Sequence, residues 1–255
     1  MSPDPFWLDH GLVALLAVVF PVRASTLGYR RLLLADEDSV PAARLALYRQ
    51  GMALQWTLAA STLGLWAWRG RGWAALGLVP RVALGFWITL GILAVAGAAV
   101  LVQRRKALGD PEALASVRHR LQHVERLLPR SAGELKWFYR LSITAGACEE
   151  LLYRGYLIWY LGHWLGPFGG AAVAALVFGF GHLYQGPRGI LTTALAGAAL
   201  TGIYLASGSL YLGMLAHALG DMHSGQLARV AFGSPPPAPE TASDETPQAG
   251  PELEA

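Results

Sequence analysis

The feature that most constrains this chain is the recurrence of apolar segments long enough to cross a lipid bilayer. A membrane-spanning helix needs roughly 20 mainly apolar residues, and residues 82–102 form such a segment without one charged side chain. Segments of similar character lie at 52–68, 170–184 and 190–207. They are too long for strands and lack the turns that punctuate a β-barrel. Only 15% of the 255 residues are charged, against about 25% in soluble domains, so we predict an all-α membrane protein.

Three further segments complete this prediction. Residues 11–22 are apolar but short, and they reach across a bilayer only together with their flank, 6–10. We interpret them as a span and not as a cleaved signal peptide, because the first ten residues hold Asp4 and Asp9 but no Lys or Arg. Residues 132–161 and 210–232 are long and mainly apolar. The sequence thus predicts a polytopic transmembrane helical bundle of about seven spans.

The distribution of basic residues predicts the orientation of the bundle. Cytoplasmic connections collect Lys and Arg close to the ends of spans. With the N-terminus outside, the outer connections hold only Arg69, Arg71 and Arg81, whereas most of the 20 basic residues fall in the inner ones. We therefore expect the N-terminus outside and the C-terminus inside. The arginine-rich, asparagine-free composition suggests a bacterial inner membrane, with the lipid bilayer as partner and no nucleic acid.

Changes in composition divide the chain into four regions. Residues 1–103 form a transmembrane scaffold, 104–131 an amphipathic cytoplasmic connection, and 132–232 a transmembrane core that contains unusual polar residues. Residues 233–255 are rich in proline and acidic side chains. Such a segment buries too little apolar surface to offset the entropy of ordering, so we expect a disordered cytoplasmic tail.

The amphipathic connection has the pattern of a helix. Asp110 precedes Pro111, which is typical of an N-cap followed by proline at the first helical position. Apolar residues then recur at spacings of a helical face: Leu114, Val117, Leu121, Val124 and Leu128. This predicts a basic amphipathic helix on the cytoplasmic membrane surface; packing against neighbouring elements is the alternative. Ser131 and Glu134 then fit a capping box that opens the next helix.

Three ionisable residues lie within an otherwise apolar stretch of that next helix. Glu149, Glu150 and Arg154 would each cost about 2.5–3.5 kcal/mol at the centre of a span, which packing alone does not require. Glu150 and Arg154 are four residues apart, so they share a face and can pair. Glu149 points about 100° away. A carboxylate without an arginine suits a general base; an ion cluster near the membrane surface is the alternative.

Two later helices contribute further titratable side chains. His182 follows Phe178 by four residues, and Gly179 and Gly181 between them would let a neighbouring helix approach closely. His217 and Asp221 are also four residues apart and share a face. Taken singly, each histidine could be an ordinary core or interfacial residue. Together the three helices supply a set of carboxylates and imidazoles that predicts a reactive site.

These residues resemble the three ordered motifs of the CAAX prenyl protease and bacteriocin-processing family, CPBP, also called Abi. The motifs of that family read Glu-Glu-x-x-x-Arg, Phe-x-x-x-His and His-x-x-x-Asn or Asp. They match Glu149-Glu150-Leu-Leu-Tyr-Arg154, Phe178-Gly-Phe-Gly-His182 and His217-Ala-Leu-Gly-Asp221 in order. The resemblance covers residues 129–232, and it makes the segment 132–232 the catalytic core.

The resemblance implies an intramembrane endopeptidase that hydrolyses a peptide bond of a membrane-embedded or lipid-associated protein or peptide. Glu149 with His182 would activate the attacking water, and Glu150 with Arg154 would hold the first glutamate in place. His217 and Asp221 would bind the developing oxyanion. Eukaryotic members of the family cut prenylated C-terminal peptides, and bacterial members are linked to bacteriocin processing, immunity and signalling.

The resemblance leaves the cofactor open. In a metalloprotease mechanism, Glu149, His182 and His217 would hold a divalent metal such as zinc, which takes three or four such ligands. No His-Glu-x-x-His element supports that mechanism from spacing, so a metal-free enzyme is the other possibility. Asp221 can donate to an oxyanion only when it is protonated. It therefore orients His217, carries a proton, or binds a metal.

Two functions of other classes fit the same residues. A non-catalytic membrane immunity or binding module would use the fold for contact, with the acidic tail and the basic helix as partner surfaces. A proton-coupled transporter would use buried carboxylates and histidines as a proton relay. Such transporters are commonly built from inverted repeats, and the sequence has no repeat of fixed period. Endopeptidase activity is the expectation that the three motifs favour.

Overall fold

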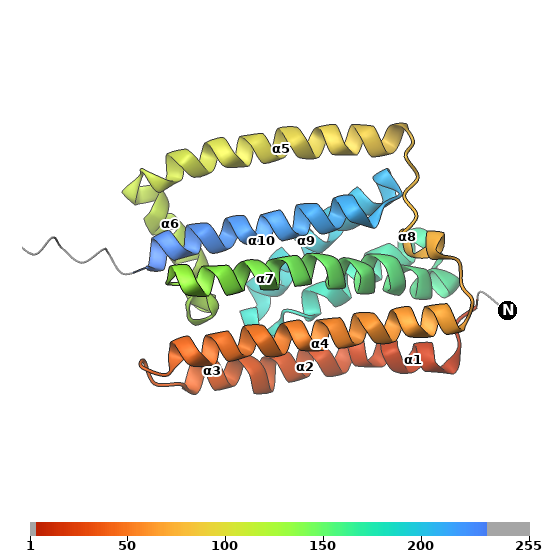
Figure 1. The fold of residues 1–255 in the computed structure, drawn as a ribbon, viewed down its shortest axis with the longest axis horizontal. Coiled ribbons are helices and arrows are strands. Elements are labelled where there is room, and N and C mark those ends of the chain that lie inside the picture. Colours follow the sequence, from red (N-terminus) through yellow and green to blue (C-terminus); the bar gives the residue numbers. More distant parts are fainter. Residues whose placement is uncertain (1–3, 234–255) are drawn as a thin grey trace, which may run out of the picture.

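The computed structural model describes residues 4–233, and these residues form a bundle of long helices without a β-strand (Figure 1). The α-helices are α1 (Trp7–Ala14), α2 (Phe20–Arg23), α3 (Arg30–Leu34), α4 (Val40–Trp68), α5 (Leu84–Leu108), α6 (Pro111–Leu121), α7 (Ala132–Glu149), α8 (Ile158–Phe180), α9 (Gly186–Ser207) and α10 (Leu210–Phe232). The π-helical segments are η1 (Leu15–Val19), η2 (Ala24–Tyr29) and η5 (Glu150–Leu157), and the 3₁₀-helices are η3 (Trp73–Leu76), η4 (Gln122–Leu127) and η6 (Leu183–Gln185).

The prediction of an all-α membrane protein is confirmed. Four helical segments of the described chain are long and apolar enough to cross a bilayer, namely Trp7–Leu34, Leu84–Leu108, Ala132–Phe180 and Leu183–Ser207. The outer faces of these helices are apolar; on α5, for example, Leu84 and Val95 are 75% and 73% exposed. A soluble protein rarely leaves such a surface open. Seven spans and the orientation stay predictions.

Several helix boundaries differ from those predicted. The first apolar segment does not end near residue 22 but continues through α3 to Leu34, so Arg23, Arg30 and Arg31 lie on a helix and not in a connection. The second helix, α4, starts at Val40 rather than at residue 52. The expected helix over 132–161 continues to a break at Gly166, whose φ of 67° is left-handed, followed by Pro167. Proline and a left-handed glycine interrupt the helical hydrogen bonds there.

The helices pack in an order that places the core segment at the centre of the bundle. α7 lies between α4 and α10, with α1 to α3 beyond α4 and α5 beyond α10 (Figure 1). Small residues allow the closest approach: a Cβ atom on Gly146 of α7 would lie 2.7 Å from the Met214 carbonyl oxygen of α10. In a bilayer, close packing of small residues is a main source of helix association. This contact brings the helix of the glutamates against the helix of His217.

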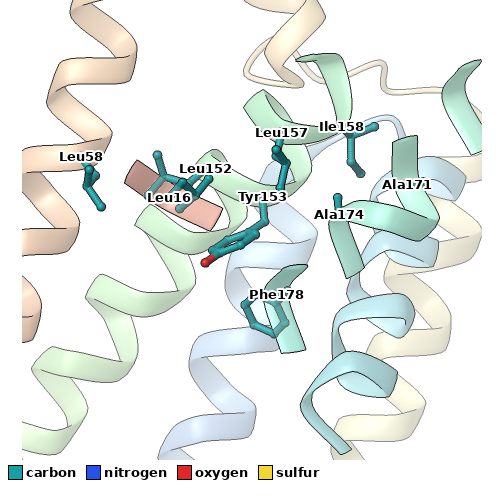
Figure 2. Packing of buried hydrophobic residues seen from close by; sticks show 9 residues of the cluster. All are labelled: Leu16, Leu58, Leu152, Tyr153, Leu157, Ile158, Ala171, Ala174 and Phe178. Carbon is teal, nitrogen blue, oxygen red and sulfur yellow. The ribbon is translucent and has the colours of Figure 1, made fainter. Parts of the chain in front are cut away.

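A cluster of buried apolar side chains supports the segment that follows the glutamates. Leu152, Tyr153 and Leu157 of η5 pack with Ala174 and Phe178 of α8 (Figure 2). Leu16 of η1 and Leu58 of α4 complete one side of the cluster and Ile158 and Ala171 the other. The N-terminal scaffold and the second half of α8 therefore hold η5 from two sides.

The amphipathic connection packs against the protein. Asp110 caps α6 by accepting hydrogen bonds from the backbone of Glu112 and Ala113, as predicted. The apolar stripe of the connection, which continues beyond α6, faces inward: Val124 and Leu128 are buried against Ala228 of α10. The arrangement is thus the alternative that the sequence left open, a helix packed on neighbouring elements. The predicted tail, 233–255, lies outside the described residues except for Gly233.

A second buried polar cluster ties the N-terminal helix to η5. Arg71 donates to both carboxylate oxygens of Asp9, at 2.9 and 2.6 Å, and Tyr156 donates to the same carboxylate at 2.7 Å. Asp9 is completely buried, and the Arg71 guanidinium lies 4.4 Å from the ring centroid of Trp159. A bidentate arginine–carboxylate pair has a fixed geometry. The cluster therefore fixes α1 relative to the helix that carries the predicted site.

Candidate active site

The two adjacent glutamates lie where the α-helix of α7 changes into the π-helix of η5. Ser131 and Glu134 form the predicted capping box at the start of α7, and Glu149 is its last residue. The prediction of an uninterrupted α-helix is wrong here, because η5 is π-helical from Glu150 to Leu157. π-helical turns are rare and are frequently found at functional sites, although η1 and η2 lie in the N-terminal scaffold. The extra residue per turn changes the direction in which the side chains after Glu149 point.

Glu150 and Arg154 form the ion pair that their spacing predicts. Arg154 Nη1 donates to Glu150 Oε1 at 2.9 Å. Arg154 is 1% exposed and Glu150 is 0% exposed. Arg154 Nη2 also donates to the carbonyl oxygen of Gly197 on α9 at 3.0 Å. The guanidinium lies 4.2 Å from the ring centroid of Phe178, within reach of a cation–π interaction. Arg154 thereby connects η5 with α8 and α9.

Two glycines make room for this buried pair. A Cβ atom at position 197 would lie 2.8 Å from the Phe178 ring and 3.3 Å from Arg154 Nη2. A Cβ atom at Gly213 of α10 would lie 3.1 Å from Glu150 Oε2. Real Cβ atoms rarely approach this closely, so side chains at both positions would displace the ion pair. Glycine at 197 and 213 is therefore part of the architecture of the site.

His217 is oriented by the second glutamate. Its Nδ1 lies 2.8 Å from Glu150 Oε1, the oxygen that also accepts from Arg154. A carboxylate in this position accepts a hydrogen from Nδ1, which leaves Nε2 on the far side of the ring. Nε2 lies 3.9 Å from Glu149 Oε2 and 3.7 Å from Asp221 Oδ2. The imidazole edge of His217 thus faces two carboxylates, one from each of the two helices.

Glu149 is held by a residue of the scaffold. Gln55 of α4 donates from Nε2 to Glu149 Oε1 at 2.8 Å, and both residues are buried, 7% and 8% exposed. The other oxygen, Oε2, faces His217. Each oxygen of the carboxylate therefore has a different neighbour. Sequence reasoning treated residues 1–103 as scaffold only and did not identify Gln55.

His182 reaches the site through Phe178. His182 lies in the turn after α8, because that helix ends at Phe180. The Nδ1 atom of His182 is 3.0 Å from the Phe178 carbonyl oxygen. The Phe178 ring is 5.2 Å from the His182 ring and 6.0 Å from the His217 ring, centroid to centroid. Phe178 therefore lies against both imidazoles. Gly179 makes the predicted close approach, because a Cβ atom there would lie 2.8 Å from Ala194 of α9.

The predicted site residues thus form two groups joined by one ring. Glu149, Glu150, Arg154, His217 and Asp221 are connected by direct polar contacts within 4.0 Å. His182 contacts Phe178 and Tyr184, and the ring centroid of Tyr184 is 5.8 Å away. Over residues 4–233, no three His, Cys, Asp or Glu side chains gather as a metal ion requires. The structure therefore does not gather Glu149, His182 and His217 into a three-ligand group, and their role as metal ligands stays a prediction.

A comparison with protein families matches the segment that carries these residues. Residues 131–223 match the family described as type II CAAX prenyl endopeptidase Rce1-like. The resemblance to the CAAX protease family is confirmed. The match begins at the N-cap of α7 and ends just after Asp221, so it contains all six predicted site residues. Comparison with curated proteins and with solved structures gives no match.

Gln55 lies outside the Rce1-like segment. It comes from α4, more than 70 residues before the match begins, yet it contacts the first glutamate of the Rce1-like motif directly. The only sequence signal was an amide close to the start of the predicted span 52–68, in Met-Ala-Leu-Gln-Trp. Polar residues inside a span usually find a partner. That rule could have marked Gln55 as buried, but it could not have paired it with Glu149.

Proposed function

We propose that this protein is an intramembrane endopeptidase that hydrolyses a peptide bond of a membrane-associated protein or peptide. The observation that carries the proposal is the placement of Glu149. This carboxylate is buried in an apolar bundle, has one oxygen hydrogen-bonded to an amide, and directs the other toward an imidazole. The Rce1-like match over residues 131–223 supports a CAAX-type protease, and the apolar outer faces of the helices support a substrate that arrives from the bilayer.

The two glutamates are assigned unequal roles. Glu150 is fully buried, and its Oε1 already accepts from Arg154 and His217. Its Oε2 is buried without a hydrogen-bond partner among the described residues. A carboxylate held on one oxygen by two donors suits a support of the site better than its base. Glu149 is held by the Gln55 amide, which is neutral, and its Oε2 lies beyond hydrogen-bond distance from His217 Nε2. We therefore assign Glu149 as the general base.

The proposed reaction is hydrolysis by an activated water. Glu149 takes a proton from a water molecule while the water oxygen attacks the carbonyl carbon of the peptide bond. His182, whose Nδ1 is engaged by a backbone carbonyl, acts together with Glu149 in activating this water. His217, protonated on both ring nitrogens and held through Nδ1 by Glu150, donates from Nε2 to the carbonyl oxygen on which negative charge develops. Asp221, whose Oδ2 lies 3.7 Å from the same Nε2, orients this imidazole, and it donates to the oxyanion itself only when it carries a proton. The carbon–nitrogen bond then breaks, and the proton held by Glu149 passes to the leaving amine. A general base contributes about 10²–10⁴-fold to such a reaction.

A comparison of membrane proteins tests this proposal. Cells that contain the wild-type protein are compared with cells that contain Glu149→Ala, and the N- and C-termini of membrane polypeptides are mapped by mass spectrometry. We expect at least one polypeptide to be shortened only in the presence of the wild type. Substrate uptake without any new terminus would instead favour the transporter, and this proposal would then be wrong.

We further propose that the enzyme acts without a bound metal. The donor set explains why: His217 Nδ1 is engaged by Glu150, His182 Nδ1 lies on a backbone carbonyl, and the described residues form no three-ligand cluster. We expect activity to be unchanged after extensive dialysis of the purified protein against a chelator, with less than one equivalent of zinc by elemental analysis. Loss of activity on chelation, with recovery when zinc is restored, would show a metalloenzyme.

A further inference from the structure

We infer that Gln55 is a positioning residue for Glu149, so that the scaffold outside the Rce1-like segment sets the geometry of the catalytic base. This inference rests on the proposed function, because it concerns how the proposed base is held. It adds a residue that neither the three motifs nor the family match contains. The argument depends on one hydrogen bond, one unpartnered atom and one neighbouring contact.

The hydrogen bond fixes the carboxylate plane. Gln55 Nε2 lies 2.8 Å from Glu149 Oε1, while Glu149 Oε2 faces His217. A glutamate side chain without such a donor rotates freely about its last torsion, which is broad. With one oxygen held, the second oxygen has a defined direction. General-base catalysis depends strongly on such placement, because misplacement by about 1 Å can cost 10²-fold in rate.

The burial of Gln55 is difficult to explain by packing alone. The residue is 7% exposed, and its Oε1 is a buried atom without a hydrogen-bond partner. A buried polar group without a partner lowers stability, and an apolar side chain of the same size would avoid that loss. The rest of α4 consists largely of apolar residues, so an apolar side chain at position 55 would fit its surroundings. An amide at position 55 is therefore retained at a cost in stability, and the group it serves is Glu149.

A different contact holds the two helices together. Trp56, the next residue of α4, donates from Nε1 to Thr144 Oγ1 of α7 at 3.3 Å. Arg44 and Glu134 join the same helix pair at its other end by a buried salt bridge of 2.6 Å. α4 and α7 are thus connected without Gln55. This separation makes Trp56→Phe a matched control, since it removes an α4–α7 hydrogen bond one residue away without touching Glu149.

The experiment first measures the reactivity of Glu149 with dicyclohexylcarbodiimide in alkaline buffer. This reagent labels protonated carboxyl groups in apolar surroundings, and a donor to the ionised form keeps a carboxylate unprotonated. We expect Gln55→Met to be labelled at Glu149 about tenfold faster than the wild type, since a hydrogen bond to a charged group contributes about 1.5–3 kcal/mol. Glu149→Gln identifies the labelled site, because it removes the reactive carboxyl. Trp56→Phe should be labelled at the wild-type rate.

The second measurement is the kinetics of cleavage of an internally quenched, prenylated CAAX peptide in detergent micelles. For Gln55→Met we expect kcat to fall about 10–100-fold with KM within a factor of about two, and for Gln55→Glu a larger fall, because a second carboxylate repels Glu149. Trp56→Phe should keep wild-type kcat. Labelling and kcat of Gln55→Met equal to the wild type, or changed equally in Trp56→Phe, would overturn the inference while leaving the proposed function intact. If the wild type cleaves neither this peptide nor any membrane polypeptide, the proposed function fails first.

Discussion

Replacing Glu149 by glutamine is expected to stop cleavage while the protein stays inserted and folded. Glutamine has the size of glutamate and can still occupy the space between Gln55 and His217, but it cannot accept a proton from water. We expect the rate of substrate cleavage to fall by about 10²–10⁴-fold. The measurement is the appearance of the shortened membrane polypeptide over time. His182→Ala should have a comparable effect, because His182 is the proposed partner of the base.

The control for this prediction is the same substitution outside the site. Glu125 of η4 pairs with Arg130 at 3.5 Å, and its side chain is 44% exposed, so Glu125→Gln should leave cleavage unchanged. Size-exclusion profiles in detergent and thermal unfolding establish that each variant is folded. Wild-type cleavage by Glu149→Gln or by His182→Ala would refute the assigned mechanism. Full biological activity of Glu149→Ala would instead indicate an immunity or binding module.

The polar pairs within one helix could be predicted from the sequence, because helical spacing alone determines them. Glu150 and Arg154 are four residues apart, and they pair even though η5 is π-helical. His182 and Phe178 likewise stay in contact although His182 lies in a turn after the helix. Local spacing tolerates such changes of helix type, because the side chains involved are long enough to adjust. The spacings within the motifs therefore predicted these contacts correctly, whereas the catalytic roles of the residues stay predictions.

Contacts between helices could not be predicted in the same way. The pairing of Gln55 with Glu149 depends on how far α4 is shifted along α7. That shift is set by contacts between these two helices, such as the Arg44–Glu134 salt bridge and the hydrogen bond from Trp56 to Thr144. In the sequence, Asp9 lies in the flank of the first apolar segment and Arg71 lies in an outer connection, and no pattern relates the two residues. In the fold they form a buried pair. No periodicity within one segment contains this information.

Boundaries between helices and connections were wrong for a related reason. The predicted span 52–68 placed Arg44 before its start, in one of the inner connections that collect basic residues. In the structure Arg44 lies on α4 and is 1% exposed, since Glu134 neutralises it at 2.6 Å. A charged residue inside a helix is acceptable when its partner is at hand. The partner was the capping-box glutamate, which the sequence assigned to a local role only.

The second large effect is expected from Arg154→Met, which should destabilise the protein by about 3–5 kcal/mol. The substitution leaves Glu150, which is 0% exposed, without its cation. It also removes the donor to the Gly197 carbonyl and the guanidinium over Phe178. Thermal unfolding of the purified protein in detergent micelles measures the loss. Arg130→Met is the matched control, because its exposed pair with Glu125 contributes only about 0.2–1 kcal/mol.

A double variant separates the charge of this pair from its role in catalysis. In Glu150→Gln with Arg154→Met, no uncompensated charge remains, and replacing both partners of a buried pair is often close to neutral. We therefore expect most of the lost stability to return. Cleavage should stay well below wild type, because the neutral amide holds His217 less firmly than the carboxylate that now lies 2.8 Å from its Nδ1. If Arg154→Met alone is as stable as the wild type, Glu150 is not held as an ion by Arg154, and its assignment as the charged support of the site is wrong.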